Sequence, residues 1–254
     1  MFWYKTCFYL VSNNLFHFGG IGLGYSTQIN IAPEPTTQSS VDDVGRQSYW
    51  DIAYSDVLSE IPQSFPSQFA AFCVGEIASL GSHKIIDLAC GNGRDTLFFA
   101  QQGFDVLAIE KSHAAIRKLS RLIHHLENVQ VSIADLVNDE VPSSQVRATK
   151  CTYYSRFFIH TLHAPEIDIF MGNLAANMKA GELFMTEYRN EHDALKFKKF
   201  DNHFRAFHSS RFVADTASKH GLECRYTTEG IGLAKWHDED PSVTRQIFIK
   251  TGEV

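Results

Sequence analysis

The segment 85–95 (IIDLACGNGRD) has the residue types and the spacing of a site for a nucleotide-like ligand. An apolar run ends at Leu88, and Gly91 and Gly93 follow it before a helical pattern begins. Glycines let a ligand approach the backbone closely, and the first N–H groups of the following helix are free to bind it. The dinucleotide-binding fingerprint needs a third glycine three residues after the second, where this chain has Thr96. The segment therefore favours a nucleotide-like ligand other than NAD.

The same turn resembles the first motif of the class I S-adenosylmethionine-dependent methyltransferases, an acidic residue followed by alternating glycines. Asp87 matches the acidic residue, and Gly91 and Gly93 match two of the glycines. Ala89 stands at the place of the first glycine. The resemblance implies that S-adenosylmethionine is the cofactor and binds at this turn. Because one methyl group is a small obstruction, we expect the turn to tolerate Ala89.

Two further acidic residues match this family in order. Glu110 ends the next predicted strand, where the family has an acid that accepts hydrogen bonds from both ribose hydroxyls. Asp135 follows the third predicted strand, where the family's acid receives the adenine amino group and the backbone N–H of the next residue, here Leu136, meets the ring. A single carboxylate is usually a surface group, but this order and spacing favour a role in binding the methyl donor.

The resemblance covers residues 45–250 and is closer to one bacterial-type subgroup of small-metabolite tailoring methyltransferases. Members combine a Tyr-Trp helix, a Pro-Ser-x-Phe-Ala segment, a Gly-Asn-Gly-Arg-Asp turn and a Tyr-Ser-Arg-Phe segment. This chain has the four features at residues 49–50, 66–70, 91–95 and 154–157. The subgroup implies methyl transfer to a small metabolite.

Residues that follow the fourth and fifth predicted strands are candidates for contact with ligands, because ligands of open α/β sheets bind beyond the carboxyl ends of the strands. We expect Ser155 in the donor pocket and Arg156 near an anionic group, the alternative for Arg156 being a solvated position at a helix start. The segment 194–211 has five Lys or Arg residues and one acid, and we interpret it as a basic helix. Such a segment suits a negatively charged acceptor but is also common on a solvated face.

We assign three cations to the acceptor. Arg205 and Arg211 belong to the basic segment, and their forked side chains suit a phosphate or carboxylate. Lys235 lies in 229–241 (EGIGLAKWHDEDP), which we expect to be a long hairpin connection near the mouth of the site, a plain surface hairpin being equally compatible with the sequence.

The chain has twelve histidines, which raises the question of a metal site or a catalytic base. No H-x-x-x-H motif with an acidic partner occurs, so we predict no metal. Histidine is the natural proton acceptor for an alcohol near neutral pH. His160 and His203 are the two candidates, and Arg156 completes the predicted catalytic group.

Helical and strand patterns alternate from about residue 42 onward, which is typical of a parallel sheet with helices on both faces. We expect strands at 84–88, 104–110, 129–133, 147–154, 182–188, 223–227 and 243–250, and helices at 44–58, 68–80, 94–102 and 114–124. The predicted fold is α/β: a doubly wound, seven-stranded, mostly parallel sheet of Rossmann-like methyltransferase type, with an antiparallel last strand and an N-terminal helical cover.

The first 41 residues are expected to form a flexible extension and linker, and residues 42–254 the methyltransferase domain. Residues 1–24 are aromatic and glycine-rich, and their apolar run is too short to cross a bilayer and lacks the pattern of a signal peptide. Residues 31–42 (IAPEPTTQSSVD) carry two prolines with Ser and Thr, as linkers do.

Composition narrows the class of protein further. The net charge is −6, with 44% hydrophobic and 20% charged residues, as in ordinary globular proteins. A mildly acidic chain is poorly suited to nucleic acid, and we expect no membrane partner either. The five cysteines are odd in number and lack a C-x-x-C pair, so they favour reduced thiols and a cytoplasmic protein.

Together these patterns predict an enzyme that transfers the methyl group of S-adenosylmethionine by direct displacement. The first choice of reaction is O-methylation of a small, sugar-like or phosphorylated acceptor. The alternative enzyme is a thiol, tellurite or thiopurine-type S-methyltransferase. An alternative of another class is a non-catalytic S-adenosylmethionine-binding protein, which only Ala89 in the turn supports.

Overall fold

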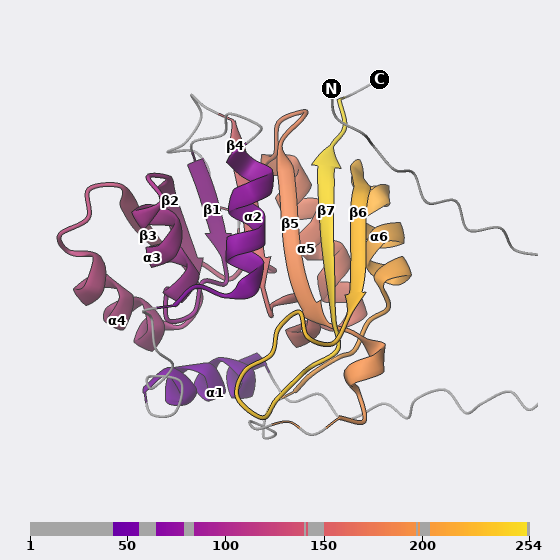
Figure 1. Cartoon of the computed structure of the whole chain (residues 1–254), viewed down its shortest axis with the longest axis horizontal. Helices are drawn as coiled ribbons and strands as arrows, with labels where there is room; N and C mark the ends of the chain where they lie inside the picture. The colour runs from indigo at the N-terminus through magenta and orange to yellow at the C-terminus, as the bar shows by residue number, and fades with distance from the viewer. Residues whose placement is uncertain are drawn as a thin grey trace, which may run out of the picture. The chain divides into compact units, whose positions relative to one another are not determined.

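The computed structural model describes residues 43–55, 65–78, 84–139, 141, 150–196, 198 and 204–252. Within them, seven strands form one sheet, and helices lie against both of its faces (Figure 1). The strands are β1 (Lys84–Leu88), β2 (Asp105–Glu110), β3 (Val129–Ile133), β4 (Cys151–Arg156), β5 (Leu183–Arg189), β6 (Leu222–Gly230) and β7 (Val243–Lys250). The helices are α1 (Asp43–Ser55), α2 (Gln68–Ala78), α3 (Arg94–Gln101), α4 (His113–Ile123), α5 (Ala164–Asn177) and α6 (Ser210–Lys219), with 3-10 helices η3 (Ile159–Thr161) and η4 (Glu191–Asp193).

The strand order is β3-β2-β1-β4-β5-β7-β6. β1 to β5 pair in parallel, and β7 pairs antiparallel with both β5 and β6. The predicted doubly wound, mostly parallel sheet with an antiparallel last strand is therefore confirmed. The order changes direction between β1 and β4, and ligands of such sheets bind beyond the carboxyl ends of the strands at this point.

Both faces of the central strands are buried, because side chains alternate between the two faces and helices cover each face. Ile85 and Tyr154 pack on one face with apolar side chains of α2, α3 and α4. Ile86 and Tyr153 pack on the other face with those of α5 and α6. This explains why the central strands are apolar almost throughout, as the sequence shows.

Most predicted elements occur, with small differences at their ends. β1, β3 and β7 have the predicted bounds, whereas β4 was expected over 147–154 and is observed over 151–156. The predicted extension over residues 1–41 lies outside the described residues, and the domain division stays a prediction. None of the described helices is both long and apolar enough to span a membrane.

The basic segment 194–211 is not the helix that we expected. A turn follows η4, residues 204–207 have no regular structure, and α6 begins only at Ser210. Lys198 accounts for the turn, because its Nζ donates to the backbone carbonyls of residues 193, 194 and 196 at 2.7–3.2 Å. Ser209 then caps α6, its Oγ accepting a hydrogen bond from Phe212 N.

Candidate functional site

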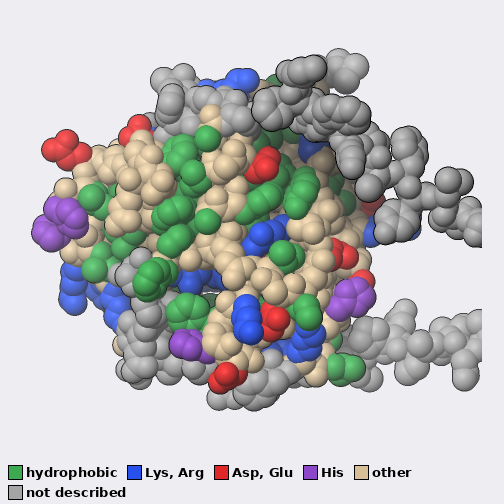
Figure 2. Space-filling view, in the orientation of Figure 1, with side chains coloured by type: hydrophobic (Ala, Val, Ile, Leu, Met, Phe, Trp, Pro, Cys, Tyr) green, Lys and Arg blue, Asp and Glu red, His purple; other side chains and the backbone are tan. Residues whose placement is uncertain are grey.

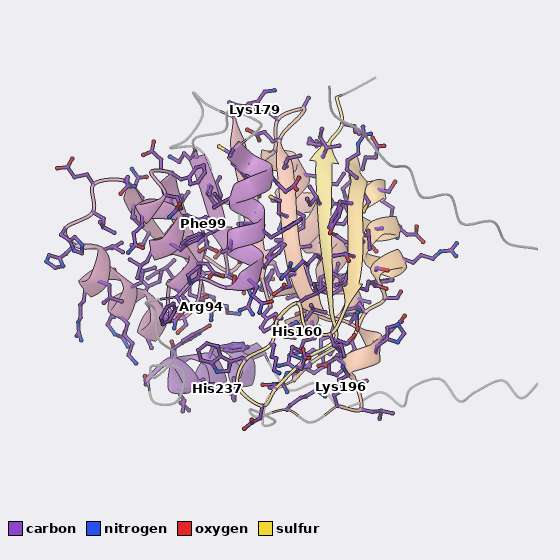
Figure 3. The ribbon with its side chains drawn as sticks, viewed as in Figure 1. Arg94, Phe99, His160, Lys179, Lys196 and His237 are labelled. Carbon is purple, nitrogen blue, oxygen red and sulfur yellow. The ribbon has the colours of Figure 1, made fainter. Side chains whose placement is uncertain are left out.

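A cavity of about 480 Å³ lies at the carboxyl ends of the central strands. Its walls come from α1, the turn after β1, the ends of β2 and β4, and the connection between β6 and β7. Figure 3 shows Arg94 and His160 at this end of the sheet, facing α1, and Lys179 at the opposite end. Figure 2 shows Lys and Arg side chains gathered over the same lower part of the molecule.

The turn after β1 forms one wall of the cavity, and its backbone is left-handed at three positions. The φ angles are +56° at Ala89, +57° at Gly91 and +77° at Gly93. A Cβ on Gly91 would collide with the Tyr54 hydroxyl, and one on Gly93 would collide with Leu119 of α4. The two glycines are therefore required both by the backbone conformation and by close packing.

Asp87 lies beneath this turn rather than at its surface. It is 2% exposed and accepts a hydrogen bond from Thr96 Oγ1 at 2.6 Å. Burial raises the pKa of Asp87 to about 8. The acid therefore joins the end of β1 to the first turn of α3, a position from which it supports the shape of the turn.

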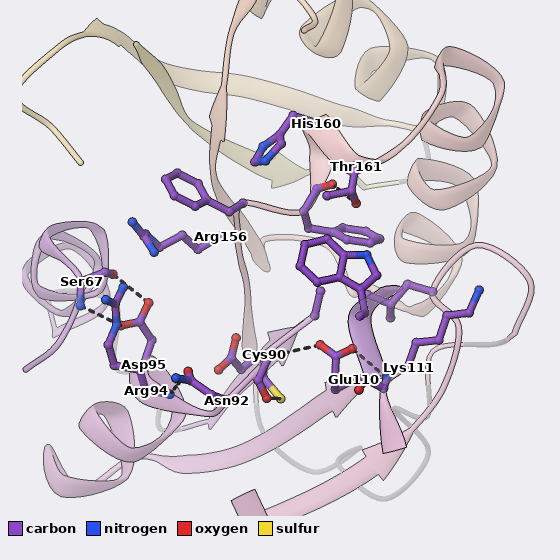
Figure 4. Close-up of a pocket in the computed structure, with 18 of the residues that line it drawn as sticks. Ser67, Cys90, Asn92, Arg94, Asp95, Glu110, Lys111, Arg156, His160 and Thr161 are labelled. Atoms are coloured by element: carbon purple, nitrogen blue, oxygen red, sulfur yellow. Dashed lines mark hydrogen bonds and ion pairs between the residues drawn. The ribbon is translucent and has the colours of Figure 1, made fainter. Parts of the chain in front are cut away.

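Glu110 connects the end of β2 to the same turn. Its Oε2 accepts a hydrogen bond from Gly91 N at 2.9 Å, and its Oε1 accepts one from Ser112 N at 2.8 Å (Figure 4). Burial raises the pKa of this carboxyl group, although the backbone hydrogen bonds oppose that shift. Each oxygen keeps a further lone pair, and Glu110 lines the cavity.

Asp135 lines the cavity next to the end of β3. Its Oδ2 is 2.7 Å from Lys111 Nζ, and it also accepts hydrogen bonds from Asn138 Nδ2 and Val137 N. Burial acts to raise the pKa of Asp135, but these partners hold it below its ordinary value. Leu136 lines the cavity beside it.

Helix α1 closes the donor side of the cavity. Asp51 accepts hydrogen bonds from Ser112 Oγ at 2.6 Å and from Ala114 N at 3.1 Å, at the start of α4. Lys118 Nζ donates to the backbone carbonyls of Tyr54 and Ser55 at the end of α1. These contacts hold Tyr54 over the glycine turn, so the C-terminal part of the predicted helical cover is tied to α4.

The other side of the cavity is rich in arginine. Arg156 Nε donates to Glu187 Oε1 at 2.8 Å, and Arg245 Nε donates to Glu187 Oε2 at 2.7 Å. Arg94 lies 3.4 Å from Asp95 through its Nε. Figure 4 shows Arg94, Asp95 and Arg156 on one side of the cavity, with Glu110 and Lys111 on the other.

Comparison with known proteins gives one family match and a short curated match. The model of the family "Tellurite resistance protein TehB" matches residues 73–185. Glycine N-methyltransferase of Mus musculus is 25% identical over 68 residues, which is 27% of this chain and 22% of that protein. The glycine N-methyltransferase of Rattus norvegicus matches to the same extent. The chain therefore matches less than a quarter of the length of these curated relatives.

Solved structures share the fold over most of the chain. A SAM-dependent methyltransferase from Anabaena variabilis has a TM-score of 0.62 at 14% identity, covering 80% of this chain and 93% of that one. The 1,6-didemethyltoxoflavin-N1-methyltransferase of Burkholderia thailandensis, with S-adenosylhomocysteine bound, has a TM-score of 0.61 at 13% identity, covering 81% and 87%. The family match, the glycine turn and this fold agree. They bear out the predicted resemblance to the class I S-adenosylmethionine-dependent methyltransferases, although the family model covers less than half of the chain.

The donor side of the cavity fits S-adenosylmethionine, the cofactor of the class that the chain resembles. Glu110 has a lone pair left on each oxygen after accepting two backbone hydrogen bonds, which matches the two hydroxyls of a ribose. Asp135 and Leu136 line the cavity one strand further along the sheet, on the side away from β4. The left-handed turn at 89–93 brings backbone to the cavity between these residues and β4.

Ser155 does not take the predicted place in the donor pocket of the methyltransferase. Its Oγ is 2.9 Å from Thr186 Oγ1, and its side chain is fully buried. Strand alternation turns Tyr154 and Arg156 toward the cavity and Ser155 away from it. The predicted position of this side chain is corrected, whereas Arg156 lines the cavity and its predicted role stays a prediction.

The predicted catalytic histidines have different outcomes. His160 lines the cavity, is 3% exposed, and accepts a hydrogen bond from Arg189 N at its Nδ1, over 3.3 Å. A neutral ring with this bond carries its proton on Nε2. His203 lies outside the described residues. The described part of the chain has no cluster of three or more side chains able to hold a metal ion.

Two of the three predicted acceptor cations line the cavity. Arg205 and Lys235 are among its lining residues, and Trp236 beside Lys235 lines it too. The side chain of Arg211 is 90% exposed and lies 3.6 Å from Asp215 on α6, so it does not line the cavity. Arg211 points outward because α6 turns Val213, Thr216 and Ala217 toward the core.

Sequence reasoning assigned no role to Arg94, Asp95 or Asp51. The run Gly-Asn-Gly-Arg-Asp contained a signal for the first two, since residues at the start of a helix after a glycine turn face the ligand end of the sheet. Asp51 lies between Trp50 and Tyr54, in the helix that the sequence marked only as a cover.

Proposed function

We propose that this methyltransferase transfers the methyl group of S-adenosylmethionine to an oxygen of a small, polar acceptor of sugar-like or phosphorylated type. The observation that carries the proposal is one cavity with two chemically different sides. Carboxylates and a glycine turn line the donor side, and arginines line the other. The methyl donor on one side and the acceptor on the other would therefore meet at the end of β4.

The reaction needs alignment more than strong acid or base catalysis. S-adenosylmethionine, when bound, supplies a methyl group already activated by its sulfonium. The chain's own task is to hold donor and acceptor in line and to exclude water, which can contribute about 7–11 kcal/mol. In this proposal Glu110 holds the ribose, Asp135 and Leu136 meet the adenine, and α1 covers the donor side.

A hydroxyl acceptor must lose its proton during transfer. His160 and His203 remain the proposed proton acceptors. Because Nδ1 of His160 already accepts the Arg189 N–H, a neutral His160 would present an N–H at Nε2. His160 would then take up a proton at Nδ1 only after that bond is given up.

The second candidate is S-methylation of a thiol or methylation of tellurite, favoured by the match to the TehB family over residues 73–185. A thiolate or tellurite acceptor arrives without a proton to remove, so it requires no positioned base. The short match to glycine N-methyltransferase makes an amine a third acceptor to test.

Turnover decides between these candidates. Purified protein would be incubated with S-adenosylmethionine and separate pools of sugar phosphates, neutral sugars, thiols, tellurite and amines, and S-adenosylhomocysteine would be measured. The proposal expects turnover with the sugar or sugar phosphate pools. Turnover only with thiols or tellurite would establish the second candidate. Donor binding without turnover in any pool would favour a non-catalytic protein.

A further inference from the structure

Arg94 and Arg156 share an arrangement that leaves their terminal nitrogens directed to the cavity. In each, the Nε atom faces a carboxylate: Arg94 Nε lies 3.4 Å from Asp95, and Arg156 Nε donates a hydrogen bond to Glu187. Among the described residues, no acceptor lies within hydrogen-bond distance of Nη1 or Nη2 of either arginine. Both residues line the cavity, and their side chains are only 12% and 19% exposed.

The carboxylates near this pair are already engaged. Asp95 accepts hydrogen bonds from Ser67 N at 2.8 Å, Ser67 Oγ at 2.7 Å and Tyr154 OH at 2.7 Å. Glu187 is fully buried and shared between Arg156 and Arg245. Three guanidinium groups therefore share two carboxylates, and the cavity side of the cluster carries excess positive charge.

The two guanidinium groups lie within electrostatic reach of one another. Burial lowers the pKa of Arg94, and the charge of Arg156 lowers it further. Burial acts to raise the pKa of Asp95, but the charges of Arg156 and Arg94 hold it below its ordinary value, so this carboxylate already interacts with both guanidinium groups. Since Glu187 is shared with Arg245, the three arginines still exceed the two carboxylates, and a further anion in the cavity would be favourable.

A third arginine in the cavity provides a contrast. Arg189 donates from Nη1 to Asp193 at 2.8 Å and from Nη2 to Glu239 at 2.5 Å, so both of its terminal nitrogens are paired. The ring centroid of Phe157 is 4.0 Å from the guanidinium carbon of Arg156 and 5.5 Å from that of Arg189. Phe157 therefore packs on Arg156, whose terminal nitrogens, unlike those of Arg189, have no carboxylate partner among the described residues.

The position of the pair associates it with the acceptor. Arg156 is anchored through Glu187 of β5 to Arg245 of β7, and Arg94 lies 6.0 Å from the ring of Trp236 in the β6–β7 connection. Glu110, the acid proposed for the ribose, is the last residue of β2 and lies across the cavity in Figure 4. Asp135, the acid proposed for adenine, follows β3 and lines the same cavity.

We propose that Arg94 and Arg156 together bind an oxyanion, a carboxylate or a phosphate, carried by the methyl acceptor. This proposal rests on the proposed function, because it assumes that S-adenosylmethionine binds on the opposite side of the cavity. Forked guanidinium groups bind two oxygens of such an anion at once. The pair would fix the orientation of the acceptor before the methyl group is transferred.

Binding of simple anions tests the pair without knowledge of the acceptor. Protein saturated with S-adenosylhomocysteine would be titrated with inorganic phosphate and, separately, with malonate, at constant ionic strength, by calorimetry. Arg94→Gln and Arg156→Gln should each weaken binding of the preferred anion by about tenfold or more. Arg211→Gln, the exposed control, should stay within about twofold. The preferred anion distinguishes a phosphate from a carboxylate group.

Two further measurements keep the outcome clear. Arg156→Lys keeps the charge beside Glu187 and should restore folding and part of the anion affinity, which guards against a variant that merely unfolds. Affinity for S-adenosylhomocysteine should stay within about twofold in each variant. A large loss there would mean that the pair binds the carboxylate of the donor, and the inference would be wrong.

Equal anion affinity in the wild type and in both Gln variants would also overturn the proposed anion site at Arg94 and Arg156. Failure of the proposed function looks different, because the wild type would then either not bind S-adenosylhomocysteine or show no turnover with the sugar and sugar phosphate pools. In that case the same anion titrations on the ligand-free protein would still decide whether Arg94 and Arg156 form an anion site.

Discussion

Replacing Glu110 by glutamine should weaken donor binding far more than it weakens the fold. The carboxylate accepts Gly91 N and Ser112 N, one on each oxygen, and is proposed to accept the two ribose hydroxyls with the remaining lone pairs. Glutamine keeps one acceptor oxygen and places an NH₂ group at the other position. One backbone N–H and one ribose hydroxyl then face the NH₂ group, which donates hydrogen bonds, instead of a carboxylate oxygen that accepts them.

The magnitudes follow from the loss of these hydrogen bonds. A charge-assisted hydrogen bond contributes about 1.5–3 kcal/mol, so the Kd for S-adenosylhomocysteine should rise by about 10- to 150-fold. The buried, unpaired N–H should lower the free energy of unfolding by about 1–3 kcal/mol. Because burial raises the pKa of Glu110, this carboxylate takes up a proton at a higher pH than an ordinary glutamate does. As the pH is lowered, the affinity of the wild type for S-adenosylhomocysteine should therefore begin to fall at a higher pH as well.

Calorimetric titration with S-adenosylhomocysteine, beside urea unfolding of the same samples, measures both effects. Glu223→Gln serves as the matched control, since Glu223 is half-exposed on β6 and paired with Arg225. The reasoning is refuted if the folded Glu110→Gln variant binds the donor product within about twofold of wild type.

Three other changes have expected outcomes. Ala89→Gly should raise Tm by about 3 °C, because a left-handed alanine costs about 1 kcal/mol, and a lower Tm would contradict this. Because its pKa is raised to about 8, Asp87 keeps a proton in the folded ligand-free protein that it loses in the unfolded chain, so stability should fall as the pH rises from about 4 to about 8. Asp87→Asn should flatten this part of a plot of Tm against pH. The same slope in both proteins would count against the argument. Arg205→Gln should raise the KM of the acceptor and Arg211→Gln should not, because only Arg205 lines the cavity; equal effects in steady-state kinetics would exclude this distinction.

The expected independence of the N-terminal extension is tested by truncation. A chain that begins at Ser39 should keep its unfolding free energy within about 1 kcal/mol of the full chain, because residues 1–30 lack a helical or strand period. Chemical unfolding of the two chains makes the comparison. An insoluble or strongly destabilised truncation would place the extension in the core.

The sequence alone predicted the sheet, and it also located the residues proposed for the donor side of the cavity. β1 and β3 are short apolar runs with clear ends, and the acids at 87, 110 and 135 each lie at or after a strand that periodicity located. Local signals suffice there because in a parallel sheet the end of each strand fixes which residues reach the ligand edge.

Only the tertiary structure decided the acceptor half. Composition marked 194–211 as a basic helix, but Lys198 binds the carbonyls of a turn instead, and Arg211 points to solvent. Arg94 and Arg156, two of the arginines that line the cavity, come from the helix after β1 and the end of β4, and each directs its Nε to a carboxylate, Asp95 or Glu187. Which edge of a guanidinium stays open depends on partners brought from other strands and loops, and no local pattern in the sequence encodes that pairing.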